Sequence, residues 1–382
     1  MHMKTYLACI GTRPEIIKIA VLYRLLRDQG HNVQLLHTGQ HEEVAQVLYR
    51  FFEMPPDYQI ELPRRSPLLG NLTATLLDRI DKVVDRADPD VLLVQGDTTS
   101  AFTGALAGYY HSISVAHIEA GLRTGEHEPF PEEKNRELIG RLAHWHFAPT
   151  AQAQANLIHE GIEPDRIFMV GNTVIDAALW VRERISQGLL DPMLAMPRQL
   201  ASFLAQHSQN RLMLVTAHRR ENWGQPIRSI AAAVVRLLNA YPELVVVWPV
   251  HPNPSVQEDV SKGLNGLPAS ARARLCLTEP LDYLAMIALL ARCYFSLTDS
   301  GGIQEEASAL ATPVLIARDS TERQELVQAG GASLVGTNTQ RIVHEAERLL
   351  DDEAVYRRMQ LLESPFGDGQ AAHRISKILV TN

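Results

Sequence analysis

The sequence predicts an α/β protein with two doubly wound domains, each a parallel sheet covered by helices. Short β-rich runs alternate with longer helical stretches along the whole chain. Several runs, such as VLLV at 91–94 and LVVVWPV at 244–250, are continuously apolar. Strands buried on both faces have this composition, which is typical of a parallel sheet. The length of 382 residues also exceeds that of one ordinary domain.

The alternation gives an expected order of elements. Strands are expected at Tyr6–Ile10, Val33–His37, Val91–Gln95, Ile113–Ile118, Trp145–Ala148, Ile167–Val170, Leu212–Thr216, Leu244–Val250, Leu275–Thr278, Tyr294–Thr298, Val314–Ile316 and Ser333–Val335. Helices are expected at Pro14–Gln29, Leu72–Ala87, Thr99–Tyr110, Ala151–Glu160, Gln225–Asn239, Asp282–Ala291, Ile303–Ala309 and Thr339–Asp351. We expect doubly wound domains at 1–180 and 205–365, joined within the weakly periodic segment 180–210. Ligands of such sheets bind beyond the carboxyl ends of the strands, which predicts a site in an interdomain cleft.

Composition limits the classes of function. The chain has 36 Lys and Arg against 44 Asp and Glu, and this net charge of −8 does not favour nucleic acid as a partner. Its three cysteines, Cys9, Cys276 and Cys293, form no CxxC pair, and we expect buried thiols in a reducing compartment. No apolar run approaches a membrane span, and the N-terminal apolar stretch is interpreted as a first strand rather than a signal peptide. A cytoplasmic protein without membrane contact is expected.

The first half carries charged groups directly after its strands. In GTRPEIIK, residues 11–18, Arg13 and Lys18 lie near a predicted helix N-terminus, where backbone N–H groups favour an anion. The alternative is an ordinary loop with solvated charges. Asp97 follows the strand VLLVQ, and its alternative role is that of the residue capping the next helix.

Further carboxylates follow the next strand. Glu119 emerges at its end, and Glu132 and Glu133 open a helix after Pro131, where the helix dipole alone can account for acidic residues. Because Asp97, Glu119 and Glu132 all come from loops at one edge of one sheet, we expect them to converge. Converging carboxylates raise one another's pKa values and suit general acid–base chemistry near neutral pH.

The second half carries groups suited to a diphosphate. His218, Arg219 and Arg220 crowd one loop after a strand, although a basic surface loop would look the same. In TDSGGIQEEA, residues 298–307, Ser300, Gly301 and Gly302 open a helix, so backbone can approach a diphosphate at the helix N-terminus. The alternative is a glycine-rich cap without a ligand.

Other polar residues in this half extend the same pattern. Glu305 and Glu306 lie one turn into that helix, where a carboxylate can accept hydrogen bonds from ribose hydroxyls. Arg318 and Arg323 could add positive charge facing it, or belong to a solvated loop. His251 follows another strand, a position at which a structural turn histidine is common.

The ordered set of motifs resembles the non-hydrolysing UDP-N-acetylglucosamine 2-epimerase family. The motifs are GTRPE, TGQH, GDTT, HIEAGLRT, PFPEEKNR, GNTVIDA, HRRE, PVHPNP, TDSGGIQEEA and TER, and the resemblance runs from about residue 6 to 380. It implies a GT-B architecture of two Rossmann-like domains, with a C-terminal helix at about 371–382 that packs back on the first domain. It also implies a homodimer.

The implied reaction interconverts UDP-GlcNAc and UDP-ManNAc, and supplies ManNAc-type sugars for surface polysaccharide. UDP is eliminated to give 2-acetamidoglucal and then adds back, so no metal and no nicotinamide cofactor is expected. The catalytic candidates that the resemblance carries over are Asp97, Glu119, Glu132 and His218. The substrate-binding candidates are Arg13, Lys18, Ser300, Gly301, Gly302, Glu306 and Arg323. Parts of a second, allosteric UDP-GlcNAc site match Gln40, Glu133, Arg219 and His251, whereas Glu43 and the PRRSPLLG stretch depart from that site.

Several alternatives remain open at the level of sequence. Relatives that act on UDP-2,3-diacetamido sugars share most of the motifs, and a hydrolysing variant would release free ManNAc. A GT-B glycosyltransferase would use the same nucleotide site but would not need three carboxylates together with HRRE. A nucleotide-sugar sensor would need no acid–base groups at all.

Overall fold

The structure is a computed structural model that describes residues 3–39, 42–62 and 68–381. The chain divides into two compact units. The first contains Met1–Ala177 and Gly367–Asn382, and the second contains Ala178–Phe366. The segment 180–210, where the sequence predicts the junction, instead forms the end of helix α7 (Thr173–Ser186) followed by helices of the second unit. The chain passes from one unit to the other inside α7.

The first unit contains a parallel sheet with the strand order β3-β2-β1-β4-β5-β6-β7. Its strands are β1 (Thr5–Ile10), β2 (Asn32–His37), β3 (Tyr58–Gln59), β4 (Val91–Gln95), β5 (Ser114–Ile118), β6 (Trp145–Ala148) and β7 (Ile167–Met169). Its helices besides α7 are α1 (Arg13–Asp28), α2 (Glu42–Phe51), α3 (Leu69–Ala87), α4 (Thr99–Tyr110), α5 (Glu132–Leu142), α6 (Ala151–His159), the 3₁₀ turn η1 (Pro164–Arg166) and α18 (Ala371–Thr381).

The second unit contains a parallel sheet with the order β10-β9-β8-β11-β12-β13. Its strands are β8 (Arg211–Thr216), β9 (Leu244–Pro249), β10 (Leu275–Thr278), β11 (Phe295–Thr298), β12 (Val314–Ile316) and β13 (Ala332–Leu334). Its helices are α8 (Pro192–Ala195), α9 (Arg198–Gln206), the 3₁₀ turn η2 (Arg220–Asn222), α10 (Gln225–Ala240), α11 (Pro254–Gly263), α12 (Ala269–Arg272), α13 (Tyr283–Arg292), α14 (Gly301–Ala309), α15 (Gln324–Gln328), α16 (Thr339–Asp351) and α17 (Glu353–Met359).

The continuous apolar strands are buried, as a sheet covered by helices requires. All five residues of β4 are buried, and so are the last five of β8. The prediction of two doubly wound α/β domains is therefore confirmed. Among the described residues, no helix is long and apolar enough to span a membrane.

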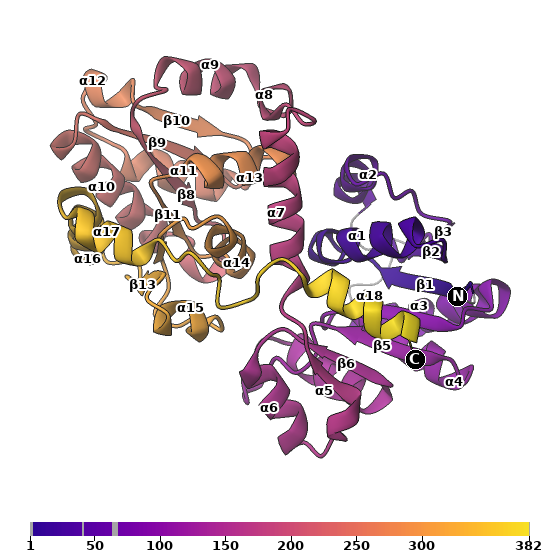
Figure 1. Ribbon diagram of the computed structural model, residues 1–382. Coiled ribbons are helices and arrows are strands. Elements are labelled where there is room, and N and C mark those ends of the chain that lie inside the picture. The colour runs from indigo at the N-terminus through magenta and orange to yellow at the C-terminus, as the bar shows by residue number, and fades with distance from the viewer. Residues whose placement is uncertain (1–2, 40–41, 63–67, 382) are drawn as a thin grey trace. The chain divides into compact units, whose positions relative to one another are not determined.

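The C-terminal helix α18 belongs to the first unit, where it packs against α1 (Figure 1). The buried carboxylate of Asp176 caps it by accepting hydrogen bonds from the backbone N–H groups of Ala371 and Ala372, at 3.3 and 2.8 Å. Lys4 donates to the carbonyl of Leu379 at 2.9 Å near the other end. A segment remote in sequence thus completes the layer of helices on the first sheet.

Candidate active site

Glu119 lies just beyond the end of β5, held by donors from three other segments. Its carboxylate contacts the Lys18 ammonium of α1 and the Gln95 side-chain amide at the end of β4. Asn172 donates a third hydrogen bond at 3.0 Å. The backbone of Glu119 has a φ of +66°, a left-handed conformation that is strained for a residue with a side chain. Such strain is typical of functional sites.

Asp97 lies at the end of the neighbouring strand β4 and pairs with α5. Its Oδ2 atom accepts two hydrogen bonds from the Arg136 guanidinium, one of them at 3.0 Å. Asn135 of the same helix donates to the Asp97 carbonyl at 2.9 Å. Burial raises the pKa of Asp97, and the charge of Glu119 adds to this rise, although Arg136 opposes it.

The alternative role for Asp97 as a helix cap is wrong. The Thr98 side chain caps α4, accepting from the Ala101 N–H at 3.1 Å. Its hydroxyl therefore performs the task that would have explained Asp97 without a function.

Glu132 is the first residue of α5 and is half-buried. Burial raises its pKa, and the charge of Asp97 adds to the rise. Glu133 is instead structural in this arrangement. It is 3% exposed and accepts from the N–H groups of Thr124 and Gly125 at 2.9 and 3.1 Å, and from Arg136 at 3.1 Å.

The three carboxylates predicted to converge lie close enough in the first unit for the charge of Glu119 to raise the pKa of Asp97 and that of Asp97 to raise the pKa of Glu132. Strands β4 and β5 are hydrogen-bonded neighbours, so Asp97 and Glu119 follow adjacent strand ends. Glu132 begins the helix α5 whose Arg136, one turn later, pairs with Asp97. Gly96 follows β4 directly, with a φ of +70°, and its N–H donates to the Ile118 carbonyl of β5 at 2.9 Å. A Cβ atom at Gly96 would lie 3.7 Å from Glu119 Oε2.

The first βα loop differs from the expected anion cradle. The backbone N–H groups of Gly11 and Thr12 donate to the carboxylate of Glu15 and are occupied by it. Lys18 is 7% exposed and forms the ion pair with Glu119, so it neutralises a carboxylate rather than lying in solvent. Arg13 is half-buried, and no ion pair of its side chain is found in the described parts of the chain.

In the second unit, the Ser300–Gly302 turn opens α14 as expected. Ser300 is the N-cap residue, and its side chain makes no capping hydrogen bond. A Cβ atom on Gly302 would meet nothing within 4 Å, whereas one on Gly301 would lie 2.9 Å from the Arg323 guanidinium carbon. The turn therefore has an open backbone position beside a cation, and both favour an anionic ligand.

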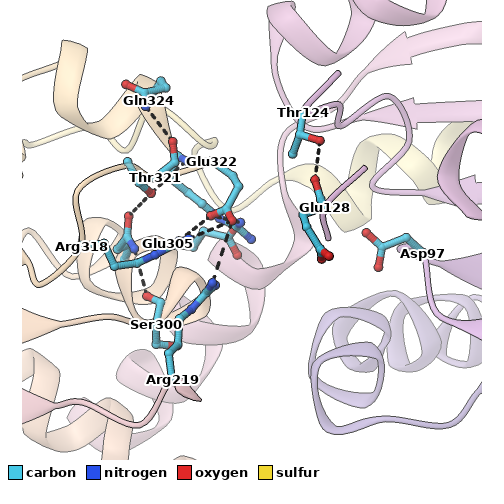
Figure 2. A network of polar contacts seen from close by, with 12 residues as sticks. Asp97, Thr124, Glu128, Arg219, Ser300, Glu305, Arg318, Thr321, Glu322 and Gln324 are labelled. Carbon is cyan, nitrogen blue, oxygen red and sulfur yellow. Dashed lines mark hydrogen bonds and ion pairs between the residues drawn. The ribbon is translucent and has the colours of Figure 1, made fainter. Parts of the chain in front are cut away.

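The arginines near this turn share one carboxylate (Figure 2). Glu322 lies 2.9 Å from Arg318, 3.6 Å from Arg323 and 4.0 Å from Arg219. Burial raises the pKa of Glu322, but the hydrogen bond from Arg318, a backbone hydrogen bond and the charges of Arg318 and Arg323 together outweigh burial, and the pKa falls to about 2. Arg323 also pairs with Glu305 at 2.9 Å. These guanidinium groups are held in place before any ligand binds.

His218 is anchored through a buried aspartate. Asp299 is fully buried and accepts from the backbone N–H groups of His218 and Arg219 at 2.9 Å each, and from the Asn222 amide at 2.9 Å. The His218 Nδ1 atom lies 3.5 Å from Asp299, and the side chain is 47% exposed. Loops after β8 and β11, which are neighbouring strands, are therefore tied together.

The remaining candidates fall in different surroundings. Glu306 is 7% exposed on α14. His251 accepts from the Asn253 N–H at 3.1 Å, as a structural turn histidine would. Arg219 belongs to the Glu322 cluster, and Gln40 lies outside the described residues.

Sequence reasoning missed the residues that hold the candidates in place. These are Glu15, Gln95, Arg136, Asn172, Asp299 and Glu322. All of them stand within or directly beside the motifs, which marked these segments as functional. The spacing of residues along the sequence does not show which side chains pair across two loops.

Two parallel α/β units with polar loops beyond their strand ends define the class of two-domain proteins with a GT-B-like fold. Comparison with known proteins agrees. The sequence profile of the UDP-N-acetylglucosamine 2-epimerase family matches residues 24–380. A UDP-N-acetylglucosamine 2-epimerase of Yersinia pestis is 44% identical over 375 residues, which cover 98% of this chain and 97% of that protein.

Solved structures extend the likeness to the fold. The crystal structure of a putative UDP-N-acetylglucosamine 2-epimerase from Listeria monocytogenes has a TM-score of 0.89 at 36% identity, covering 100% of this chain and 96% of that one. The UDP-GlcNAc 2-epimerase from Neisseria meningitidis, bound to UDP-GlcNAc, has a TM-score of 0.85 at 36% identity, covering 99% of this chain and 100% of that one. This chain belongs to the UDP-N-acetylglucosamine 2-epimerase family, and the resemblance inferred from its motifs is confirmed.

Proposed function

We propose that the protein interconverts UDP-GlcNAc and UDP-ManNAc by reversible inversion at C2 of the sugar. The observation that carries this proposal is that Asp97, Glu119 and Glu132 lie close enough in the first unit for their charges to raise the pKa values of Asp97 and Glu132. Family membership supports the same substrate, because relatives with solved structures bind UDP-GlcNAc and UDP.

The reaction proceeds by elimination and re-addition. A base removes the C2 proton, the electrons of the C–H bond form the C1–C2 double bond, and the C1–O bond breaks with its electrons leaving on UDP. The intermediates are UDP and 2-acetamidoglucal. A proton then reaches C2 from the opposite face while a UDP oxygen adds to C1. Atoms and electrons balance without an external oxidant or reductant.

The two faces of C2 require one group that accepts a proton and one that donates. Glu119 suits the acceptor because the Lys18 ammonium beside it favours the ionised carboxylate. Glu132 suits the donor because burial and the charge of Asp97 raise its pKa. The roles exchange when the reaction runs in reverse. Burial also raises the pKa of Asp97. When Asp97 is ionised, its negative charge disfavours ionisation of Glu132.

Retention of UDP between the two steps is assigned to the second unit. The N–H groups of the Ser300–Gly302 turn and the α14 dipole stabilise a diphosphate, and Arg323 lies against Gly301. His218 is exposed beside the same strand ends and can donate to a phosphate oxygen.

The test is incubation of the protein with UDP-GlcNAc in D2O, followed by proton and phosphorus NMR. The expected result is a stable mixture of UDP-GlcNAc and UDP-ManNAc, with deuterium at C2 and no net release of UDP. Accumulation of UDP with free ManNAc would show a hydrolysing enzyme instead. If C2 exchange occurred only with a UDP-2,3-diacetamido sugar, that sugar would be the substrate. If neither sugar exchanged its C2 proton, the protein would not be an epimerase.

A further inference from the structure

Glu15 is a buried carboxylate that the proposed chemistry does not use. It is 1% exposed and stands at the third position of α1. Its Oε2 atom accepts from the N–H groups of Gly11 and Thr12 at 2.9 and 2.6 Å, and its Oε1 atom accepts from the Thr98 hydroxyl at 2.6 Å. A capping box accounts only for the contact with Thr12, which is the N-cap residue. The contact with Thr98 spans 83 positions of the chain and needs another explanation.

The loops that Glu15 joins both lead to site residues. Gly11 and Thr12 follow β1 and run directly into Arg13, while Thr98 follows Asp97 after β4. Strands β1 and β4 are neighbours from which the sheet continues in opposite directions, to β2 and to β5. This is the topological switch point, where ligands of such sheets bind. Glu15 therefore spans the part of the first unit where a ligand is expected.

The second unit has an equivalent device. Strands β8 and β11 occupy the switch point of its sheet. The fully buried Asp299, after β11, accepts two backbone N–H groups of the loop after β8. In both units a buried carboxylate closes the gap between the two loops beside the switch point. The repetition on unrelated sequence positions favours a shared role over an incidental cap.

We propose that Glu15 is a positioning residue that sets the place of Asp97 for catalysis by bridging the loops after β1 and β4. This inference rests on the proposed function. Glu15 touches none of the reacting atoms, because its oxygens are occupied by the three donors of the two loops. It acts by making the backbone at Gly11–Thr12 and the N-terminus of α4 one rigid piece.

The three donors also predict how substitutions behave. In Glu15→Gln the amide oxygen can accept both backbone N–H groups, and the amide N–H can donate to the Thr98 hydroxyl, which has a lone pair available. Burial raises the pKa of Glu15, which agrees with a site that tolerates a neutral group. Glu15→Ala leaves all three donors without their acceptor, and the two loops are then free to separate.

The experiment compares steady-state epimerisation of UDP-GlcNAc by the wild-type enzyme and by E15A and E15Q. Misplacement of a catalytic group by about 1 Å costs about 100-fold in rate, so we expect kcat of E15A to fall by about 100-fold with KM changed by less than about threefold. The E15Q enzyme should retain at least about a tenth of the wild-type kcat. If Glu15 served only to stabilise the fold, both variants would lose folded enzyme, and the folded enzyme that remained would have the kcat of the wild type.

A matched control lies at the opposite ends of the same two strands, where β1 and β4 begin. Asp90 precedes β4 and accepts from the Thr5 N–H at 2.7 Å. D90A removes a carboxylate that bridges β1 and β4 away from the site, and its kcat should equal that of the wild type. Should E15A fail to fold, T98V removes one of the three contacts together with the Thr98 cap of α4, and T98S restores both. T98V should then lower kcat and T98S should recover it. T150V, which removes the equivalent cap of α6, controls for the loss of a helix cap and should leave kcat unchanged.

Two results would overturn the inference. One is a folded E15A enzyme whose kcat lies within about threefold of the wild type. The other is an E15A/T98V double variant whose kcat loss equals the product of the single losses, since residues acting through one bridge are not additive. A wild-type enzyme without C2 exchange would instead refute the proposed function itself, so the two failures are distinguishable.

Discussion

Replacing Arg136 by methionine removes a cation that contacts two carboxylates of the first unit. The Arg136 side chain is 11% exposed, Glu133 is 3% exposed and Asp97 is 23% exposed. Breaking such a pair by removing one partner costs about 3–5 kcal/mol. Glu133 keeps two backbone donors, so we expect the lower value, a loss of about 3 kcal/mol at pH 7. Methionine preserves the length and the apolar stem of the side chain.

Thermal unfolding measures the first consequence. For a unit of this size, about 3 kcal/mol corresponds to a fall in Tm of about 6–12 °C. The fall should shrink at acid pH, where protonation removes the unpaired charges. Arg141 is exposed on the same helix and donates to the Glu160 carbonyl at 2.6 Å, so R141M is a matched control that should change stability by less than about 1 kcal/mol.

The pH dependence of kcat measures the second consequence. Burial raises the pKa of Asp97 and Arg136 partly offsets the rise, so R136M should raise the pKa further. If activity requires ionised Asp97, the acid limb of the kcat profile then moves to higher pH. An R136M enzyme as stable as the wild type at pH 7, with an unmoved acid limb, would refute this account of the network.

Three further predictions concern other parts of the molecule. G302A should stabilise α14 by about 0.5–1 kcal/mol, because its Cβ meets no atom within 4 Å. If a diphosphate occupies that space, calorimetry should show UDP binding weakened about tenfold. G301A should displace Arg323 and lower both the stability of the protein and its affinity for UDP. Burial raises the pKa of Asp176 from 3.8 to about 6, so the folded state holds this proton more tightly than the unfolded state does. The unfolding free energy of the wild type should therefore fall by about 2 kcal/mol as the pH rises from 4 to 6, and D176N should lack this fall in urea titrations. E322Q removes the anion that three guanidinium groups share, so UDP titrations should show tighter binding at low salt and a steeper salt dependence, and unchanged binding would count against a diphosphate at this cluster.

Local pattern was enough to predict most of the fold. Continuous apolar runs give β4 and β8 to within a residue, because strands buried on both faces leave a strong compositional signal. The two-residue strand β3 was missed because Tyr58–Gln59 is too short to show a period. The passage between the units was expected in the weakly periodic segment 180–210, but it lies earlier, inside the helix α7.

The convergence of the carboxylates could be predicted, but their partners could not. Parallel strands bring their carboxyl ends to one edge, which places Asp97 near Glu119 whatever the side chains do. The pairing of Lys18 with Glu119 depends on rotamers and on the depth of α1 against the sheet. The hydrogen bond from the Gly11 N–H to Glu15 likewise depends on the local path of the loop. From the sequence, the N–H groups of this loop were expected to bind an anionic ligand.

The central claim is that carboxylates of the first unit move the C2 proton, and substitution of two of them tests it most directly. E119Q and E132Q keep the shape of each side chain, and E137Q, on the same helix as Glu132 and paired with Lys134, is the control. The measurement is the rate of deuterium entry at C2 of UDP-GlcNAc in D2O, together with UDP binding by calorimetry. We expect exchange to fall at least about 100-fold in both variants and not in E137Q, while the Kd for UDP changes by less than about threefold. Exchange near the wild-type rate in both variants would contradict it.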